Sequence, residues 1–151
     1  MIKIINKFLI LTIFLLIFLT TNTQYASEAI IYADDISYDN KGNIIARGKA
    51  KVLYIDNIIS SDLIIYNKDK GDIFLPTSFS LKDNRNNYYY GSNGYFKNNL
   101  DYGNISDAKI LLNDGSRIVG KKVKRDKNID IISNGVYSPC KSKIKICNFL
   151  C

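Results

Sequence analysis

The chain has 151 residues, a formal net charge of +7, eleven tyrosines and no histidine or tryptophan. This length is expected to form one domain, and the absence of histidine removes the commonest general base and the commonest metal ligand. The positive charge is uneven, because residues 117–151 hold nine Lys or Arg and only two Asp. Such a basic segment could meet phosphate on a lipid headgroup or a nucleic acid, or it could be a solvated strand face.

A basic start and a short apolar run open the sequence. Two lysines precede the run 8–19, which is interrupted by one Thr, and small residues follow, with plausible cleavage after Ala26 or Ala29. This pattern is typical of a secretory signal, whereas a membrane-spanning helix would need about 20 apolar residues. We therefore expect residues 1–26 to be a signal peptide and the protein to be exported, which argues against a nucleic-acid partner.

The remaining sequence is rich in Ile, Tyr, Val and Asn and shows no clear 3.6-residue apolar period. Residues 44–54 place small or apolar side chains on one face and basic ones on the other, which predicts a strand with one buried face. Apolar rows at 73–81 and 108–112 predict further strands, and the Asn- and Gly-rich segment 83–94 predicts a loop. Turns are predicted at 39–42, 68–71 and 113–116.

An internal repeat is visible in these predicted strands. Residues 33–38, followed by a turn and a strand, resemble residues 61–66 at an offset of 28, and weaker echoes occupy 91–96 and 120–125. A unit of two strands cannot bury its apolar face alone, so it must stack on its neighbours. The sequence therefore predicts an all-β fold, a short solenoid of stacked antiparallel strands.

No group of residues has the spacing of a catalytic site. Asp34 and Asp35 are adjacent, and neighbouring strand residues point to opposite faces, so they cannot serve one acid–base site. The glycines do not form a phosphate loop, because no Gly-rich turn leads from a strand into a helix. The tyrosines could stack on bases or sugars, but cross-strand packing is the more frequent role. We expect no enzymatic activity and no cofactor.

All three cysteines lie near the C-terminus, at Cys140, Cys147 and Cys151. In an oxidising compartment an odd number leaves one thiol for another chain, or for a part of the protein outside this sequence. A zinc site would lack a fourth ligand, so no metal site is expected.

Several motifs occur in a specific order along the chain. The repeated Ala/Ser-Asp-x-Ile-x-Tyr comes first, an Asp-Gly-Ser-Arg hairpin follows at 114–117, and Tyr-Ser-Pro-Cys closes the series at 137–140. Over about residues 30–140 this series resembles the OstA-like periplasmic domain of lipopolysaccharide-transport proteins, such as LptA and LptC, and in particular the N-terminal domain of the LptD family.

The resemblance implies a β-taco or β-jellyroll, open at both ends, in which lipid acyl chains lie between two walls. It implies lipopolysaccharide transport in the periplasm, with association to the outer membrane through a barrel. Residues 141–151 depart from the LptD pattern, which continues into that barrel, so a truncated LptD is expected. In the family Cys140 would pair with a barrel cysteine. A stand-alone LptA-like bridge protein and a β-solenoid with a dry core are the alternatives.

On this interpretation the apolar strand faces line a lipid groove, with space left by small residues at positions 46, 48 and 50. The first strand, near 30–38, is expected to dock an OstA-domain bridge protein by strand addition. The predicted groove residues are Ile36, Tyr38, Ile44, Ala46, Val52, Ile64, Ile73, Leu75, Phe79, Leu81, Ile110 and Leu112.

Overall fold

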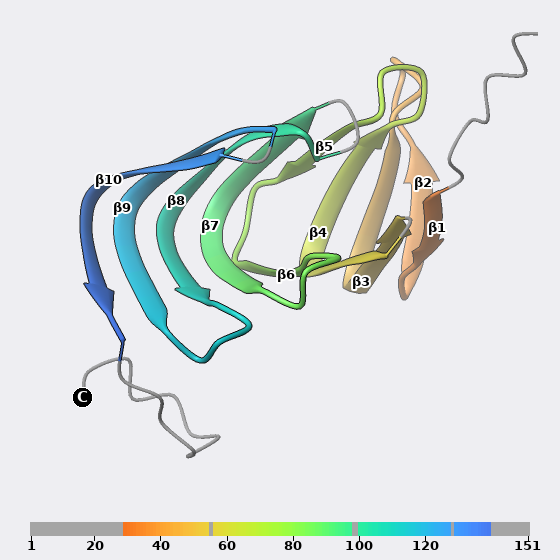
Figure 1. Ribbon diagram of the computed structural model, residues 1–151. Helices are drawn as coiled ribbons and strands as arrows, with labels where there is room; N and C mark the ends of the chain where they lie inside the picture. The colour runs from red at the N-terminus through yellow and green to blue at the C-terminus, as the bar shows by residue number, and fades with distance from the viewer. Residues whose placement is uncertain (1–28, 55, 98–99, 128, 140–151) are drawn as a thin grey trace, which may run out of the picture.

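The computed structural model describes residues 29–54, 56–97, 100–127 and 129–139. Every element in these residues is a β-strand, so the all-β prediction is confirmed (Figure 1). The strands are β1 (Ala29–Tyr32), β2 (Asp35–Tyr38), β3 (Ile44–Tyr54), β4 (Asn57–Asn67), β5 (Asp72–Leu75), β6 (Phe79–Lys82), β7 (Tyr88–Lys97), β8 (Tyr102–Leu111), β9 (Arg117–Asp126) and β10 (Ile129–Ser138).

Three predictions concern segments outside the described residues: the signal peptide 1–26, Cys140, and the tail 141–151. Within the described part of the chain, no helix is long and apolar enough to cross a membrane.

The strands form one antiparallel sheet that is folded along its middle. β3 pairs with β2 through its first half and with β1 through its second half. In the same way β4 pairs with β6 through its first half and with β5 through its second half. We call the half of the sheet that contains β2 and β5 the first wall, and the half that contains β1 and β6 the second wall. The long strands run through both walls and curve between them (Figure 1).

The fold line is visible as a change in which residues of a strand are buried. In β4 Ile59 and Ser61 are buried before the bend, and Ile64 and Tyr66 after it. Side chains alternate between the two faces of a strand with a period of two. The one-residue shift therefore lets the buried side chains point between the walls on both sides of the bend. β8 shows the same shift, and register irregularities interrupt the pairing of β3 with β4 and of β7 with β8. Bulges of this kind bend a strand.

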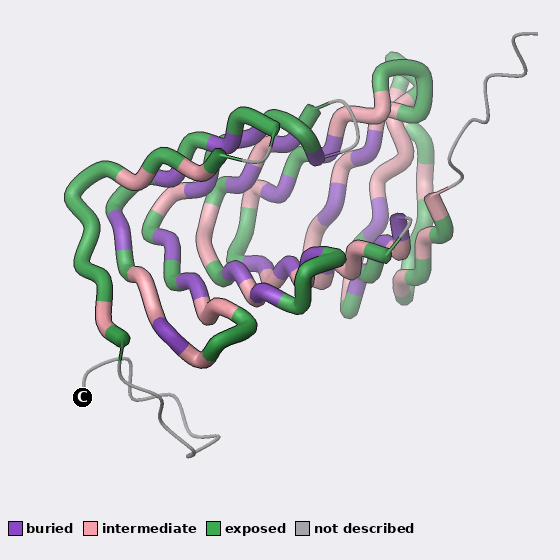
Figure 2. Tube along the Cα trace, in the orientation of Figure 1, coloured by how far each residue is buried: buried purple, intermediate pink, exposed green. Residues whose placement is uncertain are grey.

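The inner face of each wall carries one row of residues that runs across the strands. Within a row, each residue is the cross-strand partner of the next. The buried residues lie along the chain between β2 and β10, and no residue of β1, β2 or β10 is buried (Figure 2). The first row, in the first wall, is Tyr38, Ile44, Tyr66, Ile73, Phe96, Gly103, Arg125 and Asp130. The second row, in the second wall, is Ile31, Val52, Ile59, Leu81, Tyr89, Ile110, Ile118 and Tyr137.

The four repeat segments occupy equivalent places in this sheet. Residues 33–38, 61–66, 91–96 and 120–125 each run from the bend through the first wall, in β2, β4, β7 and β9 respectively. Each segment ends on a residue of the first row. The repeat therefore corresponds to one hairpin added along the axis of the folded sheet.

Two local predictions differ from the structure. The apolar row 73–81 is divided between β5 and β6, which lie in different walls, because the chain crosses the fold line between them. The predicted loop 83–94 is a loop only before Tyr88, where β7 begins. The Asn and Gly residues at 91–94 lie at the bend of β7, where Asn93 adopts a φ of 48°. The three predicted turns are confirmed.

A matched pair of glycines tests the packing at the bend. Gly42 and Gly48 have φ values of +75° and +72°; a Cβ at Gly48 would meet Asp34 Oδ2 at 2.6 Å, whereas one at Gly42 would meet nothing within 4 Å. We expect Gly42→Ala to lower the free energy of unfolding by roughly 1–2 kcal/mol through the backbone conformation alone. Gly48→Ala should lower it further, because Asp34 must also move. Urea denaturation measures both, and equal losses would contradict close packing at the bend.

Candidate functional site

Ten of the twelve predicted groove residues belong to one apolar core between the walls. Ile44 and Leu112 are half-buried and pack against this core. Ile36 and Tyr38 are exceptions, since 47% and 70% of their surfaces are exposed at the β2 end of the sheet. The other eight are buried: Ala46, Val52, Ile64, Ile73, Leu75, Phe79, Leu81 and Ile110.

The interior is filled by its own side chains in this conformation. Val52, Ile59 and Leu81 have no solvent-exposed surface. Ala46 and Ala50 are each only 1% exposed, so neighbouring side chains occupy the space that these small residues were expected to leave. Phe79 from the second wall and Phe96 from the first pack edge to face, with ring centroids 6.0 Å apart. The structure therefore has a closed interior along the middle of the molecule.

Apolar inner-face residues become accessible at the two ends of the sheet. Ile36 and Tyr38 are exposed at one end, and Tyr137 is 59% exposed at the other. Within the described residues, β1 and β2 pair only with β3, and β10 pairs only with β9. Each end of the folded sheet therefore presents both an unpaired strand edge and the end of an apolar row.

A buried polar network crosses the interior near the β10 end. Arg125 is 7% exposed, and its Nε and Nη2 donate to the two carboxylate oxygens of Asp130 at 2.9 and 3.2 Å. The guanidinium carbon lies 4.6 Å from the centroid of the Tyr89 ring. The Tyr89 hydroxyl donates to Asp130 at 2.9 Å. Because Tyr89 belongs to the second row and the other two to the first, these contacts join the walls.

The network changes the ionisation of its members. Burial raises the pKa of Tyr89 well above its ordinary value of 10.0, and the negative charge of Asp130 adds to this effect against the opposing charge of Arg125. Burial by itself would lower the pKa of Arg125, but the hydrogen bonds and charge of Asp130 outweigh it and raise the pKa. Tyr89 is therefore a neutral hydrogen-bond donor and Arg125 a fixed cation inside the molecule.

Sequence reasoning missed this network. Arg125 was counted in a basic segment that could meet phosphate or form a solvated strand face, and its neighbours Lys121, Lys122 and Lys124 are indeed exposed. The available signal was in the repeat, because Arg125 occupies the last position of its segment, where the earlier segments have Tyr38, Tyr66 and Phe96.

No family model matches this sequence, and no curated protein matches it. Among solved structures, the chain is similar to LptH, described as the LptA homologous periplasmic component of the conserved lipopolysaccharide transport device from Pseudomonas aeruginosa. The TM-score is 0.59 at 18% sequence identity, over 70% of this chain and 82% of that chain. This chain has an LptA-like fold. The expectation of an OstA-like β-jellyroll is thus confirmed for the fold. A sequence identity of 18% supports the fold alone.

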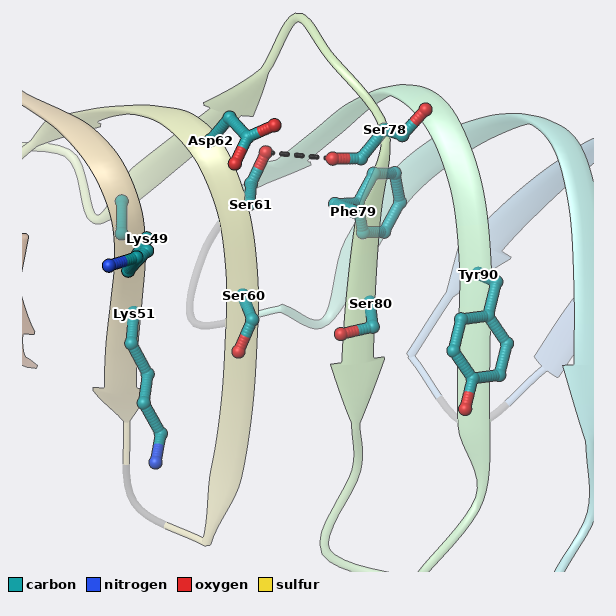
Figure 3. Close-up of a pocket in the computed structure, with 10 residues that line it drawn as sticks. Lys49, Lys51, Ser60, Ser61, Asp62, Ser78, Phe79, Ser80 and Tyr90 are labelled. Carbon is teal, nitrogen blue, oxygen red and sulfur yellow. Dashed lines mark hydrogen bonds between the residues drawn. The ribbon is translucent and has the colours of Figure 1, made fainter. Parts of the chain in front are cut away.

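The LptA-like sheet also has a groove of about 570 Å³ on its outer face (Figure 3). Its lining includes outward-facing residues of four strands together with Ala50 and Phe79 of the core. Within the described residues, no cluster of three or more metal-ligating side chains is present. Four of the groove's lining residues follow one register across β3, β4, β6 and β7: Lys51, Ser60, Ser80 and Tyr90.

The ionisation of Tyr89 tests the buried network. The folded state holds the hydroxyl proton more tightly than the unfolded chain, so this group contributes stability that is complete below pH 10 and is lost as the pH rises above it. We expect the ultraviolet difference absorbance between wild type and Tyr89→Phe to stay flat through about pH 10 in the folded proteins. The same pair in denaturant should show an ordinary tyrosine titration. An ordinary titration in the folded pair would contradict the burial of the hydroxyl.

Proposed function

We propose that this protein is a non-enzymatic periplasmic carrier of lipopolysaccharide, which holds acyl chains between the two walls of its folded sheet. The observation that carries the proposal is the pair of facing rows, apolar along most of their length, that run in register between two open ends. The similarity of the fold to LptH, a periplasmic component of a lipopolysaccharide transport device, supports the same function. The signal-like segment 1–26 supports export.

The filled interior is compatible with this proposal because the backbone hydrogen bonds join neighbouring strands within a wall and do not join one wall to the other. The strand ladders run within each wall, so separating the walls would leave them intact. Separation would break mainly side-chain contacts, and acyl chains could replace these with contacts of the same kind. Each buried methylene contributes about 0.8 kcal/mol, so a chain of about a dozen methylenes gains roughly 10 kcal/mol before entropic costs. The twelve predicted groove residues are the proposed lining of this opened state.

Docking to a second OstA-like domain is the proposed route by which lipid enters or leaves. An unpaired edge with exposed apolar side chains invites strand addition. At the N-terminal end this edge carries Ile36 and Tyr38, which face the interior side of the sheet. The docked partner would continue both inner rows beyond the end of this molecule.

Two finer assignments fit this function. The Tyr-Ser-Pro-Cys motif at 137–140 supports an LptD-type domain associated with the outer membrane, in which Cys140 forms a disulfide with a cysteine outside the domain. The similarity of the fold to LptH, described as an LptA homologous periplasmic component, supports a bridge component. Both predict the same groove and the same edge.

Two phenylalanines on opposite faces of the sheet test whether lipid lies between the walls. Phe79 is buried on the inner face, and Phe74 is exposed on the outer face of β5. With photoreactive benzoylphenylalanine at each position in turn, we expect lipopolysaccharide to crosslink at position 79 and not at 74, because only position 79 borders the proposed groove. Crosslinking at neither position, in variants that retain the β circular dichroism of the wild type, would favour a structural solenoid with a dry core.

Two adjacent residues of β2 test the docking edge. Ile36 pairs with Ala46 on the inner face, while the hydroxyl of Ser37 lies on the outer face and accepts a hydrogen bond from Arg47 at 2.9 Å. Ile36→Asp should reduce capture of an OstA-domain bridge protein at least tenfold, because a charge would have to be buried at the junction. Ser37→Asp should bind normally. Equal capture of both variants in a pull-down would exclude docking at this edge.

A further inference from the structure

The fourth repeat segment places charged residues in the first row, where the other three segments place uncharged ones. Each segment contributes its last residue and the residue opposite it on the following strand. In the fourth segment this pair is Arg125 and Asp130, an ion pair. In the first three segments the pairs carry no charge: Tyr38 with Ile44, Tyr66 with Ile73, and Phe96 with Gly103.

Stability alone does not account for this ion pair. Replacing a buried ion pair by well-packed apolar residues is often neutral or stabilising, because desolvation of the two charges offsets their attraction. The uncharged pairs of the other three segments show that the sheet accommodates such residues at equivalent positions. A buried charged residue with a specific charge partner is instead a candidate for a functional site.

The two members of the pair are placed unequally. Arg125 is 7% exposed on β9, which is held by neighbours on both sides, whereas Asp130 is 18% exposed on β10, the edge strand. Arg125 is therefore fixed inside the molecule, and the carboxylate lies between it and the open end. Local opening is easiest at edges with few neighbours, so Asp130 is the member that can leave.

We infer that Arg125 is an anion-binding residue at the β10 end of the interior, where it receives the acidic headgroup of a bound amphiphile in place of the Asp130 carboxylate. This inference rests on the proposed function and specifies the charge of its ligand. A guanidinium binds carboxylate and phosphate with the same two-pronged geometry. The shared ligand chemistry is therefore a phosphate or carboxylate attached to an alkyl tail.

The donors around Asp130 fit such a headgroup. Arg125 supplies Nε and Nη2, and Tyr89 supplies its hydroxyl from the opposite wall. The same hydroxyl lies 3.4 Å from Oδ2 of the buried Asp83, a longer contact than the 2.9 Å to Asp130. Because Tyr89 stays neutral, it remains a donor when the carboxylate is exchanged for a ligand oxygen. A phosphate group has enough oxygen atoms to accept all three hydrogen bonds, and its tail would then run between Phe96 and Ile110 into the apolar rows.

The experiment compares amphiphiles that share a dodecyl tail and differ in headgroup charge. Binding of dodecyl phosphate, dodecyl maltoside and dodecyltrimethylammonium to the full chain is measured by calorimetry below micelle-forming concentrations. For wild type we expect dodecyl phosphate to bind most tightly. Arg125→Gln should weaken its binding roughly tenfold or more, as for loss of a charged hydrogen bond. Asp130→Asn should strengthen it, because the carboxylate that pairs with Arg125 is gone.

Several controls separate this inference from the proposed function. Dodecyl maltoside should bind wild type and both variants with equal affinity. The double variant Arg125→Gln/Asp130→Asn, which buries no unpaired charge, should show no preference for the phosphate. Arg47→Gln removes a cation from an exposed ion pair with Asp35 and should leave the preference unchanged. A preference for dodecyl phosphate that survives in the double variant would overturn the role of Arg125 while leaving the carrier function intact. Failure of all three amphiphiles to bind wild type would overturn both.

Discussion

The bend in the middle of each long strand determines how this protein can use its apolar residues. A flat sheet of these strands would have one apolar face of great length, with nothing to cover it. The one-residue shift at the bend, as between Ile105 and Ala108 in β8, turns the sheet back on itself without turning the inner face outward. Two apolar rows that would lie far apart in a flat sheet then cover each other. The core, the open ends and the closed interior all follow from this geometry.

Since the strand ladders lie within the walls, side-chain packing is the main link between them. The closed apolar core and the proposed lipid groove would therefore be two states of one surface rather than two different folds. In water without lipid the walls gain by closing, because apolar area leaves the solvent. In the proposed carrier function, acyl chains would offer the side chains similar contacts and the walls would separate around them. The complete burial of Val52 and Leu81 describes the first state and does not oppose the second.

The sequence predicted a strand correctly where its buried residues keep one alternating pattern along the whole strand. It was misleading where that pattern shifts by one residue at the fold line. β3 was predicted with its observed bounds, because its buried positions keep the same parity on both sides of the bend. In β7 the parity changes at residues 91–94, and the Asn and Gly residues that permit the bend resembled a loop. Arg125 was missed for a similar reason, since its face depends on the shift within β9. The network with Tyr89 could be predicted only from the distance between the two walls, and no local sequence pattern contains that distance.

The ion pair also gives the folded sheet a direction that its repeats do not. Three hairpins carry uncharged pairs at equivalent positions, so they offer no charged contact that could orient an amphiphile along the axis. The fourth hairpin differs, because only there does the first row present a cation, at a site that a donor from the opposite wall completes. An amphiphile whose acidic group binds Arg125 would point its tail toward β1 and its head toward the β10 edge. A conduit built from repeats needs such a break in its symmetry if its cargo is to leave head first at one end.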